Sequence, residues 1–212
     1  MVRQILTSLL AGTFVCAASG LVLAQGAAPP AAPKAAKKDA APKQPAAAPV
    51  PAAPAAAAAA AGGVEPTLLG QYGTWGAYAA TPGGKRVCFA LAKPSSSKTN
   101  PPNRPRDPAY AFVSTRPAEK VINEVSIMIG YQLKPGSESS LEVGGAAYAM
   151  YTQGDGLWIK NAAEEERMVD AMRKAADVTV KGISAKGTET TDTFSLKGLA
   201  QALDRIAQDC RR

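Results

Sequence analysis

Apolar and polar residues alternate with a period of two along much of the chain after Tyr72. In the longest such run, Val125, Ile127, Ile129 and Tyr131 are separated by smaller or more polar residues. This pattern is typical of antiparallel strands that are buried on one face. The sequence predicts strands over residues 75–80, 85–92, 110–115, 124–132, 140–143, 146–152, 157–160, 177–184 and 188–194. The run Thr81-Pro82-Gly83-Gly84 between the first two predicts a hairpin turn.

In two other segments the apolar residues recur with the period of an α-helix. Asn161 is a good N-cap, and Glu164 stands three residues later, as a capping box requires. The helix that follows carries a narrow apolar stripe made of Met168, Ala171, Met172 and Ala175. A second amphipathic helix is predicted over residues 196–209, capped by Ser195, with these apolar positions: Leu196, Leu199, Ala200, Leu203, Ile206 and Ala207.

Strand number and turn spacing favour a mostly-β fold, a two-layer antiparallel β-sandwich (immunoglobulin-like) with two peripheral helices. Val87, Phe89 and Leu91 share one face of their strand, and Cys88 faces the opposite way. If Phe89 faces the sandwich core, the terminal helix covers the other face of that sheet. We then expect Leu203 to be buried, Arg205 to be exposed, and Gly198 to let the helix approach the strands closely.

The first residues resemble an export signal. Arg3 precedes an uncharged apolar run, and Val22-Leu23-Ala24 offers small residues where a signal peptidase reads them. We therefore expect residues 1–24 to be a signal peptide that is cleaved after Ala24, which places the mature protein in the periplasm or at the outer surface. A transmembrane anchor is the alternative, because the run approaches the ~20 residues that span a bilayer.

Composition divides the rest of the chain into two parts. Residues 25–66 are almost entirely Ala and Pro with scattered Lys, so they cannot bury enough apolar surface to order. They are expected to form a disordered spacer with extended polyproline character. Residues 67–212 have the length of one domain. No other stretch is apolar enough to cross a membrane.

Export makes the cysteines informative. Without the signal peptide only Cys88 and Cys210 remain, an even pair in an oxidising compartment. We predict a disulfide between them that contributes about 2–5 kcal/mol. Two reactive thiols are the alternative, although the chain has no Cys-x-x-Cys motif.

The absence of histidine and the net charge limit the classes of function that the chain can have. The chain has no histidine, which excludes Ser-His-Asp and Cys-His catalysis and imidazole metal sites. No cofactor or metal is expected. The net charge is +7 for the whole chain, but from Thr67 onward nineteen Lys and Arg stand against fifteen Asp and Glu, which leaves +4. This balance suits weak contact with anionic envelope surfaces as well as simple solubility. Nucleic acid is a poor match for an exported domain.

The segment 93–108 is the strongest candidate for a partner-binding loop. It carries four cations and five prolines: Lys93, Lys98, Arg104, Arg106, and Pro94, Pro101, Pro102, Pro105, Pro108. Prolines reduce the entropy lost on binding, and guanidinium groups suit carboxylate or phosphate partners. A solvated, proline-stiffened connection between strands explains the same residues.

Three other groups of residues favour a structural explanation over a functional one. Tyr148, Tyr151 and Trp158 could present an aromatic strip to a glycan or a partner chain, but core packing explains the same residues and is favoured. Ser184 and Lys186 stand in a polar turn that offers no burial to a catalytic lysine. The acidic triplet 164–166 points in different directions around a helix, as expected for a solvated first turn.

Several long segments of the sequence resemble the invasion-associated locus B family of alphaproteobacteria. They are Trp75-Gly76, TPGGKRVCFALAKP at 81–94, MYTQ at 150–153, GLWIK at 156–160 and TDTFSLKG at 191–198. The resemblance covers residues 72–210 and leaves out the spacer. Many members carry a further cysteine soon after the Trp-Gly element, where this chain has Ala77 and Tyr78.

The resemblance implies a periplasmic or surface-associated β-sandwich domain, linked in pathogenic members to entry into host red cells. It supplies no catalytic residue. We therefore expect a non-enzymatic envelope protein that acts in binding, adhesion or envelope maintenance, with an unidentified envelope or protein partner. A periplasmic enzyme or enzyme-inhibitor module acting on an envelope substrate is the alternative.

Overall fold

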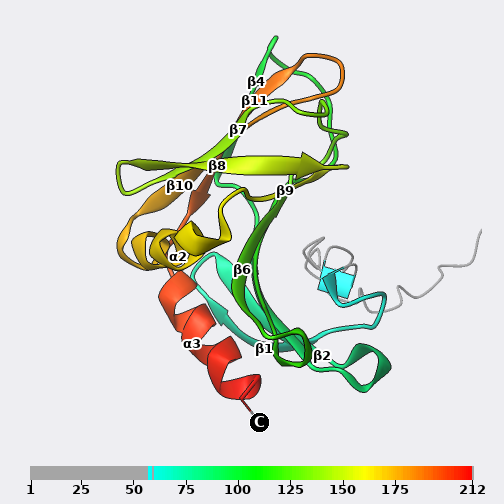
Figure 1. The fold of residues 1–212 in the computed structure, drawn as a ribbon, viewed down its shortest axis with the longest axis vertical. Coiled ribbons are helices and arrows are strands. Elements are labelled where there is room, and N and C mark those ends of the chain that lie inside the picture. The colour runs from blue at the N-terminus through cyan, green and yellow to red at the C-terminus, as the bar shows by residue number, and fades with distance from the viewer. Residues whose placement is uncertain (1–56, 59, 212) are drawn as a thin grey trace, which may run out of the picture. The chain divides into compact units, whose positions relative to one another are not determined.

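The alternating segments fold as strands in the computed structural model, which describes residues 57–58 and 60–211 (Figure 1). The strands are β1 (Thr67–Tyr72), β2 (Trp75–Ala80), β3 (Val87–Ala92), β4 (Ser96–Asn100), β5 (Tyr110–Arg116), β6 (Val121–Met128), β7 (Ser139–Val143), β8 (Ala146–Gln153), β9 (Gly156–Ile159), β10 (Asp177–Ile183) and β11 (Glu189–Ser195). The helices are α2 (Glu165–Lys174) and α3 (Leu199–Asp209), with 3-10 turns η1 (Pro82–Gly84), η2 (Pro117–Glu119) and η3 (Ala162–Glu164). The expected signal peptide and most of the expected spacer lie outside the described residues.

All eleven strands join one antiparallel sheet in the order β1-β2-β3-β5-β6-β9-β8-β7-β10-β11-β4. β6 pairs with β5 on one side and with β9 on the other, so it connects the two halves of the sheet. Figure 1 shows it running between them. The mostly-β antiparallel fold with two helices is confirmed, whereas the division into two immunoglobulin-like layers is not.

Nine strands were predicted, and eight of them begin and end within two residues of the predicted bounds. The strand predicted over 124–132 is shifted to Val121–Met128, because Gly130 turns the chain with a φ of 77° close to the Asp107 carbonyl. β1 and β4 were not predicted. β4 has the sequence SSKTN and is mainly exposed at the edge of the sheet, so no hydrophobic alternation marks it.

The sheet buries apolar residues on both faces. The main core lies on the face of Cys88 and gathers side chains from both halves of the sheet and from both helices. Phe89 belongs to a smaller cluster on the opposite face, with Phe112 and Tyr110. Phe89 is fully buried on the face opposite α3, as predicted from the sequence, but in this smaller cluster and not in the main core. β3 is buried at all six positions, so alternation could not distinguish its faces.

Helix α3 covers the Cys88 face as predicted, with Leu199, Leu203 and Ile206 fully buried. It begins at Leu199 rather than Leu196, and Ser195 remains in β11. Gly198 precedes the helix with a φ of 95°, and a Cβ there would lie 1.9 Å from the Tyr72 carbonyl oxygen. Only glycine permits this close approach. Arg205 was expected to be exposed, but it is half-buried because its Nε is covered.

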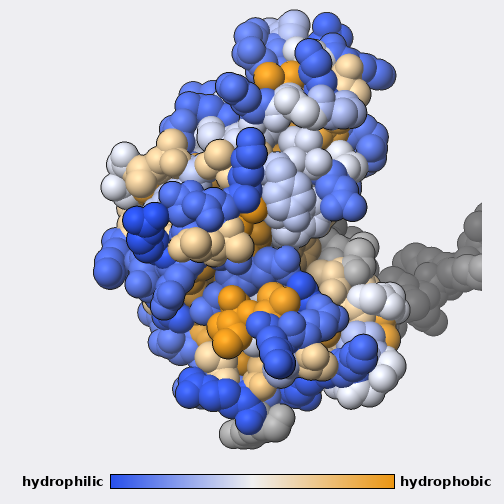
Figure 2. Space-filling view, in the orientation of Figure 1, coloured by the Kyte–Doolittle hydropathy of each residue, from blue (hydrophilic) through white to orange (hydrophobic). Residues whose placement is uncertain are grey.

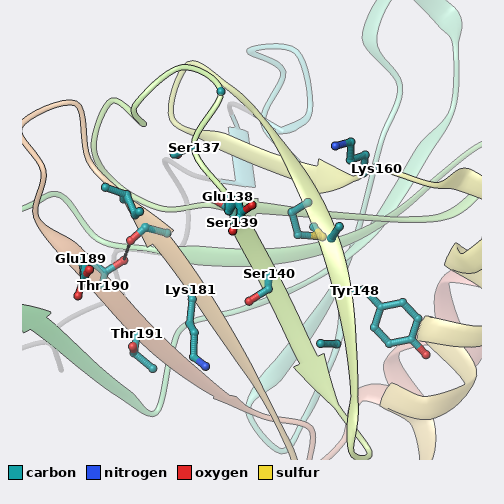
Figure 3. Close-up of a pocket in the computed structure, with 16 residues that line it drawn as sticks. Ser137, Glu138, Ser139, Ser140, Tyr148, Lys160, Lys181, Glu189, Thr190 and Thr191 are labelled. Carbon is teal, nitrogen blue, oxygen red and sulfur yellow. Dashed lines mark hydrogen bonds between the residues drawn. The ribbon is translucent and has the colours of Figure 1, made fainter.

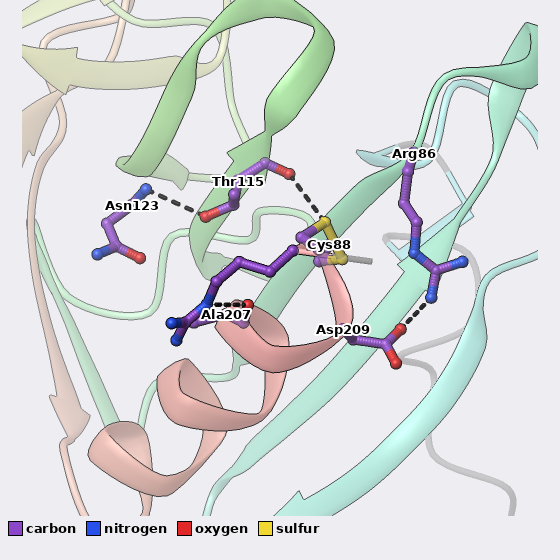
Figure 4. Close-up of a disulfide and its surroundings, with 8 residues drawn as sticks. Arg86, Cys88, Thr115, Asn123, Ala207 and Asp209 are labelled. Carbon is purple, nitrogen blue, oxygen red and sulfur yellow. Dashed lines mark hydrogen bonds and ion pairs between the residues drawn. A yellow bond between two sulfur atoms is a disulfide. The ribbon is translucent and has the colours of Figure 1, made fainter.

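The predicted disulfide joins Cys88 of β3 to Cys210, directly after α3 (Figure 4). Both cysteines are buried, and Cys210 Sγ lies 3.7 Å from the Thr115 carbonyl oxygen of β5. Arg86 and Asp209 form an ion pair beside the bridge. The end of the helix is thereby held to the sheet covalently and by charge.

The entry to α2 differs in detail from the predicted capping box. Asn161 Oδ1 accepts a hydrogen bond from the Ala163 N–H at 3.2 Å and so begins the 3-10 turn η3. Glu164 pairs with Arg167. The Glu165 carboxylate accepts a hydrogen bond from the Val125 N–H at 2.8 Å, beyond the point where β9 stops pairing with β6. Part of the acidic triplet therefore fixes α2 to the sheet.

The packed structure begins earlier than expected. Ala57 and Ala61 lie within the segment assigned to the spacer, yet both are fully buried in the cluster around Phe89. Small methyl groups can cover aromatic rings closely, which composition alone did not indicate.

Candidate functional site

The cationic segment 93–108 is only partly a loop. Its first half contains β4, which pairs antiparallel with β11 at the edge of the sheet. Its second half, after Asn100, crosses to β5 and carries Arg104 and Arg106. The surface near β4 and β11 is mainly hydrophilic in the view of Figure 2.

Arg106 forms the best-connected polar cluster of this segment. Its guanidinium pairs through both terminal nitrogens with the carboxylate of Asp192, whose side chain is 0% exposed. The same group donates to the Ile129 carbonyl at 3.1 Å and to Ser97 Oγ at 2.9 Å. Planar, bidentate pairing of this kind is specific to arginine. Arg106 therefore anchors the loop on β11.

A pocket of about 490 Å³ opens beside this anchor. It lies between the loop, the β6–β7 connection and the β10–β11 turn, and its lining is Thr99, Arg104, Pro105, Arg106, Tyr131, Gln132, Ser184, Ala185, Lys186, Thr188 and Thr190. We call it the basic pocket. Three of these side chains are cationic and none is acidic.

Two cations of the basic pocket are uncompensated. Arg104 and Lys186 are exposed, and neither forms an ion pair with any residue the structure describes. Both side chains line the same pocket. Such a pair favours carboxylate or phosphate oxygens.

Tyr131 forms a fixed wall of the pocket. Its hydroxyl shares a hydrogen bond of 2.6 Å with Thr190 Oγ1, and the Arg106 guanidinium lies 6.0 Å from the ring centroid. Burial raises the pKa of this hydroxyl. The tyrosine therefore stays neutral at physiological pH, so it offers a polar hydroxyl group to a ligand and adds no negative charge to the pocket.

The structure brings together only part of the predicted set. Arg104 and Arg106 line one pocket, whereas Lys93 lies 5.8 Å above the Tyr110 ring and Lys98 stands on β4 opposite Thr191. The sequence did not place Lys186 in this pocket, which it lines beside the two arginines. Lys186 lies in the tight turn between β10 and β11, and this position in the sequence indicates an exposed side chain at the end of these two strands.

The other sequence candidates have structural roles. Ser184 Oγ accepts from the Thr188 N–H at 3.0 Å, and Lys186 is exposed, so they do not form a buried Ser-Lys pair. Tyr151 is 46% exposed and stacks on Trp158 with ring centroids 5.8 Å apart, so an aromatic strip exists at this end of β8 and β9. Tyr148, by contrast, is half-buried against the main core.

Neither a metal centre nor a membrane span is found in the part of the chain that the structure describes. Within residues 57–58 and 60–211, no three His, Cys, Asp or Glu side chains cluster as metal ligands. No helix in the same residues has the length and apolar character needed to cross a membrane.

Comparison with known proteins identifies a family. A family model described as "Invasion associated locus B (IalB) protein" matches residues 75–207, which include most of the sheet, α2, most of α3 and the basic pocket. No curated protein and no solved structure matches the chain.

Proposed function

The chain belongs to the invasion-associated locus B family, and from that premise we propose that it is a non-enzymatic, exported binding module whose basic pocket takes an anionic group of an envelope partner. The observation that carries the proposal is the pair of uncompensated cations, Arg104 and Lys186, in a pocket without acidic side chains. The Arg106–Asp192 pair supports them by fixing the loop.

The chemistry of the pocket suits carboxylate or phosphate, which envelope glycans, lipids and proteins all present. The two exposed cations attract an anionic ligand, and this attraction should weaken as the salt concentration rises, because mobile ions screen exposed charges. A fixed loop also loses little entropy when the ligand binds. The family's name refers to invasion, and attachment to a surface is the setting in which such a contact would act in pathogenic members.

The first experiment measures binding to anionic probes. Full-length mature protein would be titrated with inorganic phosphate, with citrate, and with vesicles containing phosphatidylglycerol. We expect saturable binding that weakens about tenfold or more in an Arg104→Ala/Lys186→Ala variant. Lys93→Ala/Lys98→Ala removes the same charge outside the pocket and serves as the matched control. Equal losses in both variants would mean diffuse charge attraction rather than a pocket.

A periplasmic enzyme or inhibitor is the competing function. The absence of histidine and the lack of known enzymatic activity in the family disfavour it. A broad hydrolase screen of the purified protein separates the two ideas. Turnover that disappears after one Asp or Glu substitution would establish the enzyme and overturn the binding module.

Export to the periplasm is part of the proposal and rests on the first 24 residues. Fractionation of cells that express the full chain, together with N-terminal sequencing of the mature protein, tests it. We expect a periplasmic product that begins at Gln25. A product that keeps its first residues and pellets with membranes would favour the anchor.

A further inference from the structure

A second pocket lies over β5, β6 and β9, on the sheet face opposite the main core. It has a volume of about 640 Å³ and is lined by three aromatic side chains, Tyr110, Phe112 and Trp158, together with polar and charged groups. We call it the aromatic pocket. It shares no lining residue with the basic pocket.

The side chains of this pocket lie on one face of the sheet. In the strand register, Phe112 of β5 pairs with Ser126 of β6, and Ser126 pairs with Trp158 of β9. Trp158 in turn pairs with Tyr151 of β8. Because directly paired residues project to the same face, these four side chains form one row across four neighbouring strands.

The shared face distinguishes the aromatic pocket from a larger one of about 800 Å³ beside β7 and β10 (Figure 3). In that larger pocket Ser139 belongs to the buried face of β7, whereas Ser140 pairs with Lys181 on the opposite face. Its polar groups are therefore divided between the two faces of the sheet and do not converge on one ligand.

The Trp158 ring is held in place from two sides. It stacks on the Tyr151 ring, with the two centroids 5.8 Å apart. A Cβ at Gly156 would lie 2.2 Å from the Trp158 ring, so the indole lies over this glycine and only glycine permits that position. A ring that is fixed in advance loses little entropy when a ligand binds to it.

Two unpaired carboxylates line the pocket beside this row. Asp107 precedes β5 and Asp155 lies in the β8–β9 turn; both are exposed, and neither forms an ion pair with any residue that the structure describes. Backbone hydrogen bonds hold both at the end of β6. The Asp107 N–H donates to the Gly130 carbonyl at 3.0 Å, and the Ile129 N–H donates to the Asp155 carbonyl at 2.9 Å.

The cation of the lining does not compensate them. Arg116 already pairs with Glu124, which also lines the pocket, so the two unpaired aspartates leave the lining with a net charge of −2. Ser126 adds an unpartnered hydroxyl. The residue is 9% exposed, its Oγ forms no hydrogen bond within the described residues, and that oxygen keeps some accessible surface in the pocket. A buried polar group without a partner is costly, which points to a ligand that supplies one.

We propose that the aromatic pocket binds a lysine or arginine side chain on an extended peptide segment of a partner protein. Carboxylates attract such a cation, and so do the faces of aromatic rings, tryptophan most strongly. The Ser126 hydroxyl can accept a hydrogen bond from either side chain. One basic side chain therefore satisfies the two aspartates, the ring and the hydroxyl together. The inference is independent of the basic pocket, which takes an anion.

The length of the row favours a peptide over a free cation. Neighbouring strands lie about 4.8 Å apart, so the row from Phe112 to Tyr151 spans about 14 Å, the length of about four residues of extended peptide. Phe112 is 3% exposed and closes one end, whereas Tyr151 is 46% exposed at the other. Proline and apolar residues that flank the cation can lie on the open rings, as Pro-rich ligands do in aromatic grooves.

The test is an NMR titration of the full mature chain with the peptide Pro-Leu-Lys-Pro-Leu, acetylated and amidated at its ends. We expect saturable shifts at residues 107–114, 124–130 and 155–158. The same peptide with Nε-acetyl-lysine keeps the length and loses the charge, and it should bind about tenfold more weakly or worse. N,N′-diacetylchitobiose and choline chloride, titrated in parallel, represent a sugar and a lipid headgroup, and both should bind more weakly than the lysine peptide.

Two double variants decide whether the aspartates recognise the cation. Asp107→Asn with Asp155→Asn should weaken binding of the lysine peptide about fivefold or more. Glu138→Gln with Glu166→Gln removes the same charge at exposed positions outside the pocket and should leave the affinity unchanged. Equal losses in both variants would mean diffuse attraction and overturn the proposal. It is also overturned if the lysine peptide gives no saturable shifts at these residues, if the Nε-acetyl-lysine peptide binds as tightly, or if chitobiose or choline binds there more tightly.

Discussion

Asp192 is a buried carboxylate, and within the described residues Arg106 is the one cation that pairs with it. Replacing Arg106 by Met keeps the length of the side chain but leaves Asp192, 0% exposed, without its cation. Breaking a buried ion pair from one side costs about 3–5 kcal/mol. Arg106→Met should therefore lower the free energy of unfolding by about that amount in urea denaturation.

Two further variants make this result interpretable. Arg104→Met changes an exposed neighbour in the same loop and should cost about 0.5 kcal/mol or less. Arg106→Met combined with Asp192→Leu removes both charges and should recover much of the loss. If Arg106→Met costs no more than Arg104→Met, Asp192 does not depend on this arginine.

The two arginines also show what residue types could and could not predict about the site. Charge and proline content selected a segment of which Arg104 and Arg106 line one pocket. That this segment binds a partner stays a prediction. Arg106 looked equivalent in the sequence, but its partner is 86 residues away on β11. Lys186 and Tyr131 line the pocket because segments distant in the sequence meet in the fold, and no local sequence pattern predicts such a meeting.

Among the elements, α3 gives the sharpest test of packing. Leu203 is fully buried between the helix and the sheet, so Leu203→Ala should cost about 2–5 kcal/mol. Arg205 is unsuitable as the exposed control because it is half-buried. Gln208 is exposed on the same helix, and Gln208→Ala should cost about 0.5 kcal/mol or less. Chemical denaturation of the two variants side by side measures the difference, and similar costs would contradict the packing described.

Glu165 links α2 to β6 and makes stability depend on pH. Burial raises the pKa of its carboxyl; the Val125 N–H acts against this, the Glu124 carboxylate adds to it, and Arg116 acts against it. An acid whose pKa rises on folding stabilises the fold below its ordinary value of 4.5, and this contribution is lost as the pH rises through the folded pKa.

The Glu165→Gln variant removes that titration while it keeps an acceptor oxygen for Val125. Relative to this variant, the wild-type protein should therefore lose stability as the pH rises from about 4.5 to 7. Melting temperatures across this range measure the effect. Glu166→Gln, an exposed neighbour on α2, should run parallel to the wild type. A constant difference between wild type and Glu165→Gln at every pH would contradict the account.

At the scale of the whole molecule, the sequence predicted the elements better than their arrangement. Period-two alternation located nine strands because each buries at least one face. It could not locate β4, which is polar, nor decide which face of β3 holds the main core, since both are buried. Strand order depends on contacts between distant segments, and local periodicity carries no information about them.

The disulfide is the one long-range contact that the sequence did predict. Cys88 and Cys210 are 122 residues apart, yet they could be paired from the sequence because they are the two cysteines that remain after the predicted signal peptide. The same pair then oriented α3, since Cys210 continues the apolar stripe of Leu199, Leu203 and Ile206. One covalent constraint thus supplied the long-range information that alternation lacked.

The beginning of the packed domain is tested by two deletions. Composition predicts that residues 25–56 contribute nothing to the core, so their removal should leave the melting temperature within about 2 °C. Extending the deletion through residue 63 also removes Ala57 and Ala61, which are fully buried in the cluster of Phe89, Phe112 and Tyr110. The aromatic rings that they cover would then meet water.

The longer deletion should therefore lower stability by about 1–2 kcal/mol, from the apolar area newly exposed, and the melting temperature by about 2–8 °C. Differential scanning calorimetry of both variants and of the mature protein measures the two steps separately. A large loss already at the shorter deletion would place packed residues before Ala57 and contradict the spacer. Equal melting temperatures for both deletions would mean that Ala57 and Ala61 add nothing, and the domain would then begin near β1.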